Sequence, residues 1–109
     1  MLDIQILPAA TVTVLKFNGE LTVSGTSAVR AAAMRLRQGG RLLVDLRGIR
    51  KVDRPGLAAL VALLVRARSK VRTVGLACST PSVVDLLHRE GIDRLFPLQP
   101  VPPVGAASR

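Results

Sequence analysis

The chain has 109 residues, which is enough for one domain and too few for two. Hydrophobic residues make up 49% of it and only two residues are aromatic, both Phe, so an aliphatic core is expected. No apolar run reaches the roughly 18 residues of a membrane-spanning helix, and the first residues lack the basic start of a signal peptide. The lone cysteine excludes an internal disulfide and a zinc cluster. These features together predict a cytoplasmic protein.

The charge of the chain is strongly unbalanced. Sixteen Lys and Arg residues against seven Asp and Glu give a net charge of +9. Between residues 30 and 72, twelve basic residues face only Asp45 and Asp53, so this stretch alone carries +10 (12 − 2). Such a surplus is typical of proteins that bind nucleic acid, an anionic lipid surface or an acidic protein partner. It is equally expected in a protein from a GC-rich genome, which encodes Arg more often than Lys. Charge alone does not choose between them.

Alternating patterns predict two β-strands in the first part of the chain. Residues 3–7 alternate polar and apolar side chains until Pro8, and residues 11–17 alternate with β-branched residues. Asn18 and Gly19 follow as turn-forming residues. We therefore predict a short antiparallel strand pair at the N-terminal end.

A helical period replaces the alternation over residues 27–38, where apolar residues recur on one face. Gly39 and Gly40 predict the end of this helix. Residues 41–46 form a short apolar run typical of a buried strand, and the Arg47–Gly48 pair is predicted to turn the chain.

The next helix has a clear start signal. Asp53 is suited to cap it, and Pro55 falls in the first turn, where the missing N–H would have had no helical partner. The stripe predicted to face the core contains Leu57, Leu60, Val61 and Leu64. Further apolar residues continue around the helix, namely Ala58, Ala62 and Val65. This surplus predicts either deep burial or a partner surface.

The last third of the chain repeats the strand–helix alternation. Residues 71–77 predict a strand, and the Thr80–Pro81 pair starts a short helix that Gly91 ends. Three residues are expected to cover one end of the core: Ile92, Leu95 and Phe96.

The element order is β-β-α-β-α-β-α, with room for one more short strand near Leu95. It predicts a single α/β domain over residues 1–97, with about three helices and a mostly parallel central sheet. Residues 98–109, rich in Pro, are predicted to form a flexible tail.

Three segments in order carry a resemblance to a known family. Residues 44–57 read VDLRGIRKVDRPGL, residues 17–21 read FNGEL, and residues 91–96 read GIDRLF. The set resembles the signature of STAS domains, the family of the anti-sigma factor antagonists, over residues 11–97. The resemblance implies a bacterial protein-interaction domain that takes part in signalling and transcription regulation.

The sequence departs from that family at the site of its regulation. In anti-sigma factor antagonists, the second serine of an Asp-Ser-Ser-Gly motif is phosphorylated by a partner kinase that is also the anti-sigma factor. Here Asp53 and Gly56 are kept, but Arg54 and Pro55 occupy the two serine positions. Because proline has no hydroxyl group, no phosphorylation is expected there. Thr22 replaces a usual acidic residue of the kinase-facing surface.

The resemblance places the partner surface on a loop over Gly48–Pro55 and on the exposed face of the helix after it. The predicted partner-binding residues are Arg50, Lys51, Asp53, Arg54, Pro55, Gly56, Ala58 and Ala62. Asp53 could also be a catalytic carboxylate, but the role of helix cap is the favoured interpretation. Arg50, Lys51 and Arg54 form either an anion site at the helix N-terminus or a solvated loop.

No residue set in the sequence indicates catalysis. Cys78 is expected to pack as a small hydrophobe, and His88 to lie at the surface near Asp85. The glycines lack the spacing of a phosphate-binding loop. We therefore expect no catalytic residue, no metal site and no cofactor, and we predict that the protein is not an enzyme.

Three functions remain open from the sequence. The first is binding of an anti-sigma factor or serine-kinase-like protein without control by phosphorylation at the usual serine. The second is a STAS accessory subunit of an ABC-transporter ATPase complex. The third is a basic protein that binds nucleic acid or an anionic surface, although the near absence of aromatic residues disfavours nucleic acid.

Overall fold

A computed structural model describes residues 1–8 and 11–101 of the protein. Its strands form one four-stranded sheet in the order β1-β2-β3-β4. Their bounds are Leu2–Pro8 for β1, Val12–Leu21 for β2, Arg41–Val52 for β3 and Thr73–Ala77 for β4. β1 runs antiparallel to β2, from the pair Leu2–Gly19 to the pair Pro8–Thr13, while β2, β3 and β4 are parallel. The predictions of an N-terminal antiparallel pair and a mostly parallel sheet are confirmed.

The two central strands are longer than predicted. Asn18 and Gly19 do not form a turn, because β2 continues through them to Leu21, and the Arg47–Gly48 pair lies within β3. Asn18 pairs with Gly48, next to an irregularity in the register. A Cβ atom on Gly48 would collide with the side chain of Asn18. Glycine is therefore needed here because the two strands lie close together, and not because the chain turns.

The described residues form four α-helices and one 3₁₀ turn, η1. Their bounds are Val23–Gly25 for η1, Thr26–Met34 for α1, Arg54–Arg68 for α2, Pro81–Arg89 for α3 and Ile92–Leu95 for α4. The prediction for α1 ran too far, since the helix ends at Met34. Gly39 and Gly40, with φ of 86° and 74°, instead shape the loop to β3.

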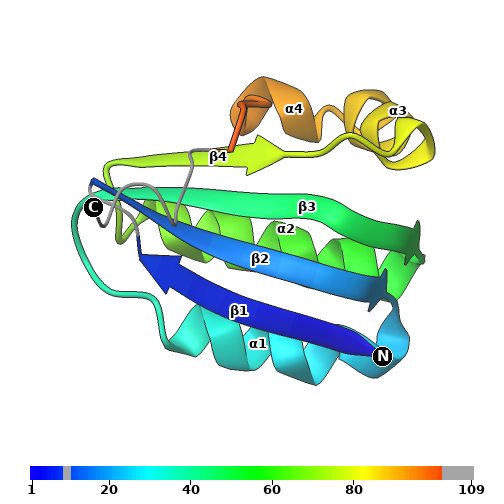
Figure 1. Cartoon of the computed structure of the whole chain (residues 1–109), viewed down its shortest axis with the longest axis horizontal. Coiled ribbons are helices and arrows are strands. Elements are labelled where there is room, and N and C mark those ends of the chain that lie inside the picture. Colours follow the sequence, from blue (N-terminus) through cyan, green and yellow to red (C-terminus); the bar gives the residue numbers. More distant parts are fainter. Residues whose placement is uncertain (9–10, 102–109) are drawn as a thin grey trace.

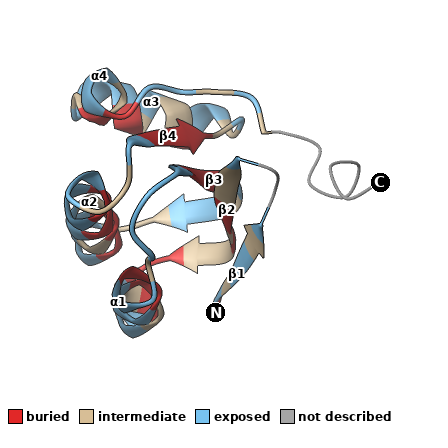
Figure 2. Ribbon diagram, turned by 90° about the vertical axis from the view of Figure 1, so that its left-hand side faces the viewer, coloured by how far each residue is buried: buried red, intermediate tan, exposed pale blue. Residues whose placement is uncertain are grey.

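The helices lie on one side of the sheet and along one edge of it. α1 and α2 cover one face, and α3 and α4 lie beside the edge strand β4 (Figures 1 and 2). The main hydrophobic cluster fills the space between sheet and helices, and Leu15, Phe17, Val44, Leu46 and Leu76 are among its fully buried members. None of the helices in the described segments is long and apolar enough to cross a membrane.

The burial of α2 refines the predicted core stripe. Leu57, Leu60 and Leu64 are buried as predicted, but Val61 is only half-buried and Leu63 is 1% exposed. The arc of the helix that faces the sheet is therefore centred closer to Leu63 and Leu64 than the sequence suggested.

The chain after α4 lies along β4. Ile92 and Phe96 are buried as predicted, whereas the expectation for Leu95 is wrong, because this side chain is 60% exposed. Leu98 forms a parallel bridge with Leu76, and the Gln99 N–H donates to the Leu76 carbonyl at 2.7 Å. Leu98 and Gln99, which form this contact, are the first residues of the predicted tail. Its residues 102–109 lie outside the described part of the chain.

The two faces of α2 are expected to respond differently to truncation. Leu63→Ala removes a fully buried side chain and should lower the free energy of unfolding by about 2–5 kcal/mol. Val65→Ala, on the exposed face of the same helix, should change it by less than about 0.5 kcal/mol. Urea denaturation of both variants measures the difference, and equal losses would contradict the burial described here.

Candidate partner-binding site

The carboxylate of Asp53 ties the start of α2 to the turn that follows β2. One oxygen, Oδ1, accepts the backbone N–H of Gly56 at 2.8 Å, and Oδ2 accepts the N–H of Val23 at 3.0 Å. The Asp53 N–H itself donates to the Leu21 carbonyl at 3.2 Å. The first contact is the predicted helix cap, and it accounts for Asp53 without any catalytic role.

Gly56 lies against the backbone of the chain that leaves β2. A Cβ atom at this position would overlap the carbonyl of Leu21 and approach the nitrogen of Thr22 within 2.8 Å. Only glycine therefore lets α2 begin this close to the end of β2. Gly56 itself is buried, so it shapes the site and offers a partner little surface.

Arg54 and Pro55 form the exposed first turn of α2. Pro55 has no backbone N–H to satisfy and its ring faces outward, at the position where the resemblance expects a phosphorylated serine. The first turn of α2 therefore carries the positive charge of Arg54 and no hydroxyl group at position 55.

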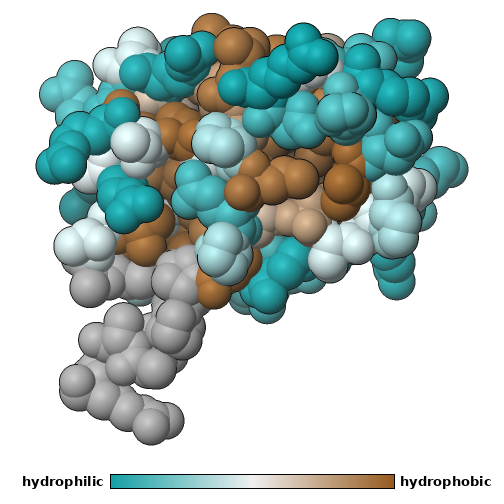
Figure 3. Space-filling view, turned by 90° about the horizontal axis from the view of Figure 1, so that it is seen from above, coloured by the Kyte–Doolittle hydropathy of each residue, from teal (hydrophilic) through white to brown (hydrophobic). Residues whose placement is uncertain are grey.

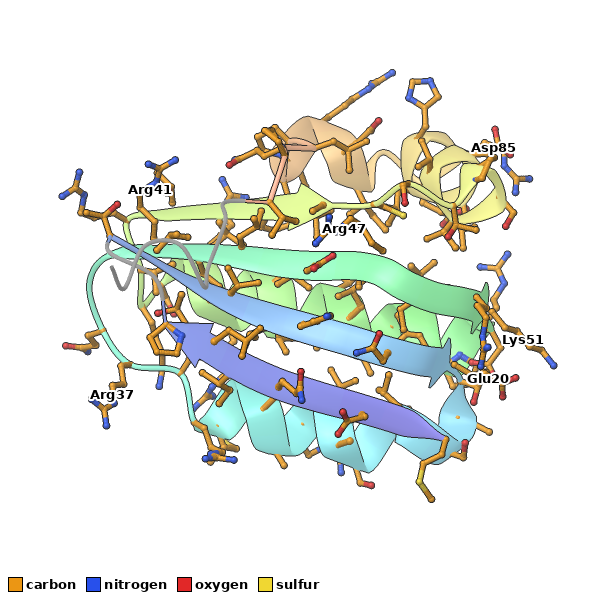
Figure 4. All side chains as sticks on the ribbon, in the orientation of Figure 1. Glu20, Arg37, Arg41, Arg47, Lys51 and Asp85 are labelled. Carbon is orange, nitrogen blue, oxygen red and sulfur yellow. The ribbon has the colours of Figure 1, made fainter. Side chains whose placement is uncertain are left out.

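Arg50 and Lys51 are exposed near the end of β3, so the predicted loop is wrong for residues 48–52, which belong to this strand. Lys51 lies opposite Glu20 in the register of β2 and β3, and Figure 4 shows both at the same end of the sheet. Because neighbouring residues of a strand point to opposite faces, Arg50 and Lys51 do not form one patch. Among the described residues, neither these two nor Arg54 forms an ion pair.

An apolar stripe runs along the outer face of α2. Ala58, Val61, Ala62 and Val65 follow the helical spacing i, i+3, i+4, i+7, and three of them are exposed, Val65 by 59%. Together with Leu95 of α4, they line a groove of about 810 Å³ that begins at Arg54 and Pro55. We call this surface the α2 groove.

The structure brings together only part of the predicted site. Arg54, Pro55, Ala58 and Ala62 all line the α2 groove. Asp53 and Gly56 set the position of the helix beneath it. Arg50 and Lys51 lie outside the lining, on the strand that leads to the helix.

The predicted partner-binding residues did not include Val65 and Leu95, which also line the α2 groove, although Val65 was part of the predicted apolar surplus. The spacing of Val65 from Ala58 and Ala62 was a usable signal, because the three share one helical face. No sequence signal placed Leu95 there, since its exposure depends on how α4 packs beside α2.

Several titratable residues outside the α2 groove have local contacts or burial that account for them. Asp45, 1% exposed, accepts two hydrogen bonds from the Arg47 side chain at 3.0 and 3.1 Å, and these raise the pKa of Arg47. Burial raises the pKa of the Cys78 thiol, which favours its unreactive neutral form. His88 pairs with Asp93 at 3.0 Å rather than with Asp85. Within the described segments, no cluster of His, Cys, Asp and Glu has the arrangement of a metal site.

Comparison with known families agrees with this arrangement. Residues 8–100 match the family described as "Mlab, STAS domain". The chain belongs to the STAS domain family. No curated protein sequence gives a significant match.

Solved structures of other proteins share the fold of this chain. An anti-sigma-factor antagonist (STAS) domain protein from Planctomyces limnophilus is 25% identical, with a TM-score of 0.72 and coverage of 91% of this chain and 90% of that one. An anti-sigma factor antagonist from Mycobacterium paratuberculosis is 20% identical, with a TM-score of 0.72 and coverage of 100% and 96%. A sulfate transporter family protein from Wolinella succinogenes is 14% identical, with a TM-score of 0.65 and coverage of 83% and 74%.

The double contact of Asp53 leads to a prediction for stability. Asp53→Ala removes the helix cap and the bond to Val23, so it should lower the free energy of unfolding by about 1–2 kcal/mol. Asp85→Ala, which removes a surface carboxylate paired with Arg89 on α3, should cost less than about 0.5 kcal/mol. Thermal or urea unfolding compares the two, and an equal effect would show that the Asp53 carboxylate does not hold the site.

Proposed function

We propose that this STAS domain is a non-catalytic interaction module that binds an anti-sigma factor or a serine-kinase-like protein through the α2 groove. The observation that supports this most is the apolar stripe on the outer face of α2. A helix that already buries one face against the sheet gains no stability from a second apolar stripe in water. Such a stripe is typical of a surface that another protein covers.

The chemistry of the groove suggests the kind of partner segment that fits. Its lining is mostly aliphatic, and the charged lining residues are two arginines, Arg54 and Arg68, and one acid, Glu90. A partner helix with small apolar residues along one face and carboxylates at its margin would bury the stripe and meet these charges. Figure 3, seen from the side of α3 and α4, shows further hydrophobic patches among hydrophilic residues on that side of the protein.

The proposed binding is not controlled by phosphorylation at the usual position. Arg54 and Pro55 stand at the two serine positions of the family motif, and neither has a hydroxyl group. A phosphate would place about two negative charges at the N-terminus of α2 and switch the surface. With a fixed positive charge there instead, the surface keeps one state, and binding is constitutive.

A second candidate is a STAS accessory subunit in an ABC-transporter ATPase complex. The same permanent surface favours it, because a lasting structural contact needs no switch. The similarity in fold to a sulfate transporter family protein is compatible with it. Both candidates use the α2 groove, so the identity of the bound protein distinguishes them. Both would act in the cytoplasm.

A charge placed in the groove should abolish partner binding. Ala62→Glu puts a carboxylate on the exposed stripe, where a partner would have to bury it unpaired. Its affinity for the protein that co-purifies with the wild-type chain should fall by about a hundredfold or more, while the melting temperature changes by less than about 2 °C. Affinity is measured by titration calorimetry with the purified partner.

Ser27→Glu is a matched control, because Ser27 is exposed on α1, away from the groove. It should bind like the wild type. Full binding by the Ala62→Glu variant would contradict a docking role for α2, and a large loss of melting temperature would place Ala62 in the core.

The basic residues near the start of α2 are expected to raise the rate at which the partner associates. Replacing Arg50, Lys51 and Arg54 with Ala should lower the association rate constant about tenfold at low salt and leave the dissociation rate within about twofold. At physiological salt, screening over about 8 Å should shrink the difference. Surface plasmon resonance at both salt concentrations measures these rates. An unchanged association rate at low salt would mean that these residues are only a solvated surface.

A further inference from the structure

A second group of basic residues lies at the end of the molecule opposite the start of α2. The parallel strands begin at this end, where Val12, Arg41 and Thr73 are neighbours in the register. Figure 4 shows Arg37 and Arg41 there, far from Glu20 and Lys51. The strand β3 separates the two ends by about 35 Å, given about 3.3 Å per residue. The basic residues of this end are Arg35, Arg37, Arg41, Arg68, Lys70 and Arg72.

Three of these arginines line one hollow. Arg41 begins β3, Arg68 ends α2, and Arg72 lies in the connection to β4. The hollow measures about 670 Å³, and Thr73 and Gln99 add hydrogen-bonding groups to its wall. No acidic residue is among its lining residues. We call it the arginine hollow.

The charges of the arginine hollow are not neutralised by side-chain carboxylates. All seven Asp and Glu residues of the sequence are in the described part, and those that form ion pairs there are Asp45, Asp85 and Asp93. Their partners are Arg47, Arg89 and His88. Bringing three guanidinium groups to one concave surface raises the free energy of the folded protein, and a bound anion would lower it.

The backbone holds the three arginines in place. The Gly39 N–H donates to the Lys70 carbonyl, and the Arg72 N–H donates to the Gly40 carbonyl, both at 2.8 Å. These bonds tie the loop before β3 to the loop before β4. The guanidinium of Arg68 lies over the ring of Phe96, 5.4 Å from its centre. The helix dipole explains a basic residue at the end of α2, but it does not explain Arg41 and Arg72.

We propose that the arginine hollow binds a phosphate group. Guanidinium groups donate paired hydrogen bonds that match the oxygens of a phosphate, and several of them around one hollow favour a doubly charged anion over a single carboxylate. The phosphate belongs either to a free phosphate ester or to a lipid headgroup, since both present the same oxygens. The hollow adjoins the end of the α2 groove, because Arg68, Leu95 and Phe96 line both, but Arg41 and Arg72 belong to the hollow and not to the groove. The phosphate proposal does not depend on the function proposed for the groove.

Titration calorimetry of the full chain with sodium pyrophosphate at low ionic strength tests the site. Wild-type protein should bind one equivalent, and the double variant Arg41→Gln/Arg72→Gln should bind at least about tenfold more weakly. The matched control is Arg50→Gln/Lys51→Gln, which removes the same charge from the other end and should stay within about twofold. Both pairs are exposed, so the fold is expected to persist, and circular dichroism checks this.

Vesicle sedimentation distinguishes the two sources of phosphate. Binding to vesicles of phosphatidylglycerol and phosphatidylcholine, lost in the Arg41→Gln/Arg72→Gln variant and absent with phosphatidylcholine alone, would assign the hollow to a lipid headgroup. Pyrophosphate binding without vesicle binding would assign it to a free phosphate ester. No binding of either probe, or equal weakening in both double variants, would overturn the proposal. So would binding only to random duplex DNA, which would indicate a nucleic-acid surface instead.

Discussion

The two hydrogen bonds accepted by the Asp53 carboxylate join the start of α2 to the turn after β2, and the position of the α2 groove depends on them. One oxygen satisfies the Gly56 N–H and the other the Val23 N–H. Gly56 then allows the helix to approach the Leu21 carbonyl, where any side chain would collide. This arrangement fixes the first turn of α2, so that Arg54 and Pro55 point outward and the stripe from Ala58 to Val65 faces away from the sheet. Asp53 and Gly56 therefore have a structural role at the start of α2 that needs no serine at positions 54 and 55.

The surplus of positive charge separates into two ends with different surroundings. Near the start of α2, Arg54 borders the apolar groove, while Arg50 and Lys51 lie on β3 at the end of the sheet that also holds Glu20. At the opposite end, three arginines surround a hollow that has no acidic lining residue. A separation of about 35 Å exceeds the screening length of about 8 Å several times, so the two groups act independently at physiological salt. The groove and the hollow adjoin at Arg68 and Phe96, which line both, whereas Arg54 belongs to the groove alone and Arg72 to the hollow alone.

Local signals were enough to predict the fold class and much of the candidate site. The alternation of strands and helices, the cap at Asp53 and the apolar surplus on α2 are properties of short sequence segments, and each appears in the structure. The predictions were wrong where a residue type is common both in turns and at close contacts between strands. Asn18 and Gly48 resemble turn residues, but they lie side by side in neighbouring strands, a contact that no local window reveals. The exposure of Leu95 and the meeting of Arg41, Arg68 and Arg72 likewise depend on packing between segments distant in the sequence.

Site-specific photo-crosslinking tests most directly whether the outer face of α2 is the protein-binding surface. A photoreactive amino acid at position 65 lies on the exposed stripe, and the same amino acid at position 30 lies on the exposed face of α1. Irradiation of the complex with the purified partner should give an adduct from position 65 and none from position 30, with the linked partner segment identified by mass spectrometry. Adducts of equal yield from both positions, or none from position 65 while the complex remains intact, would contradict the account.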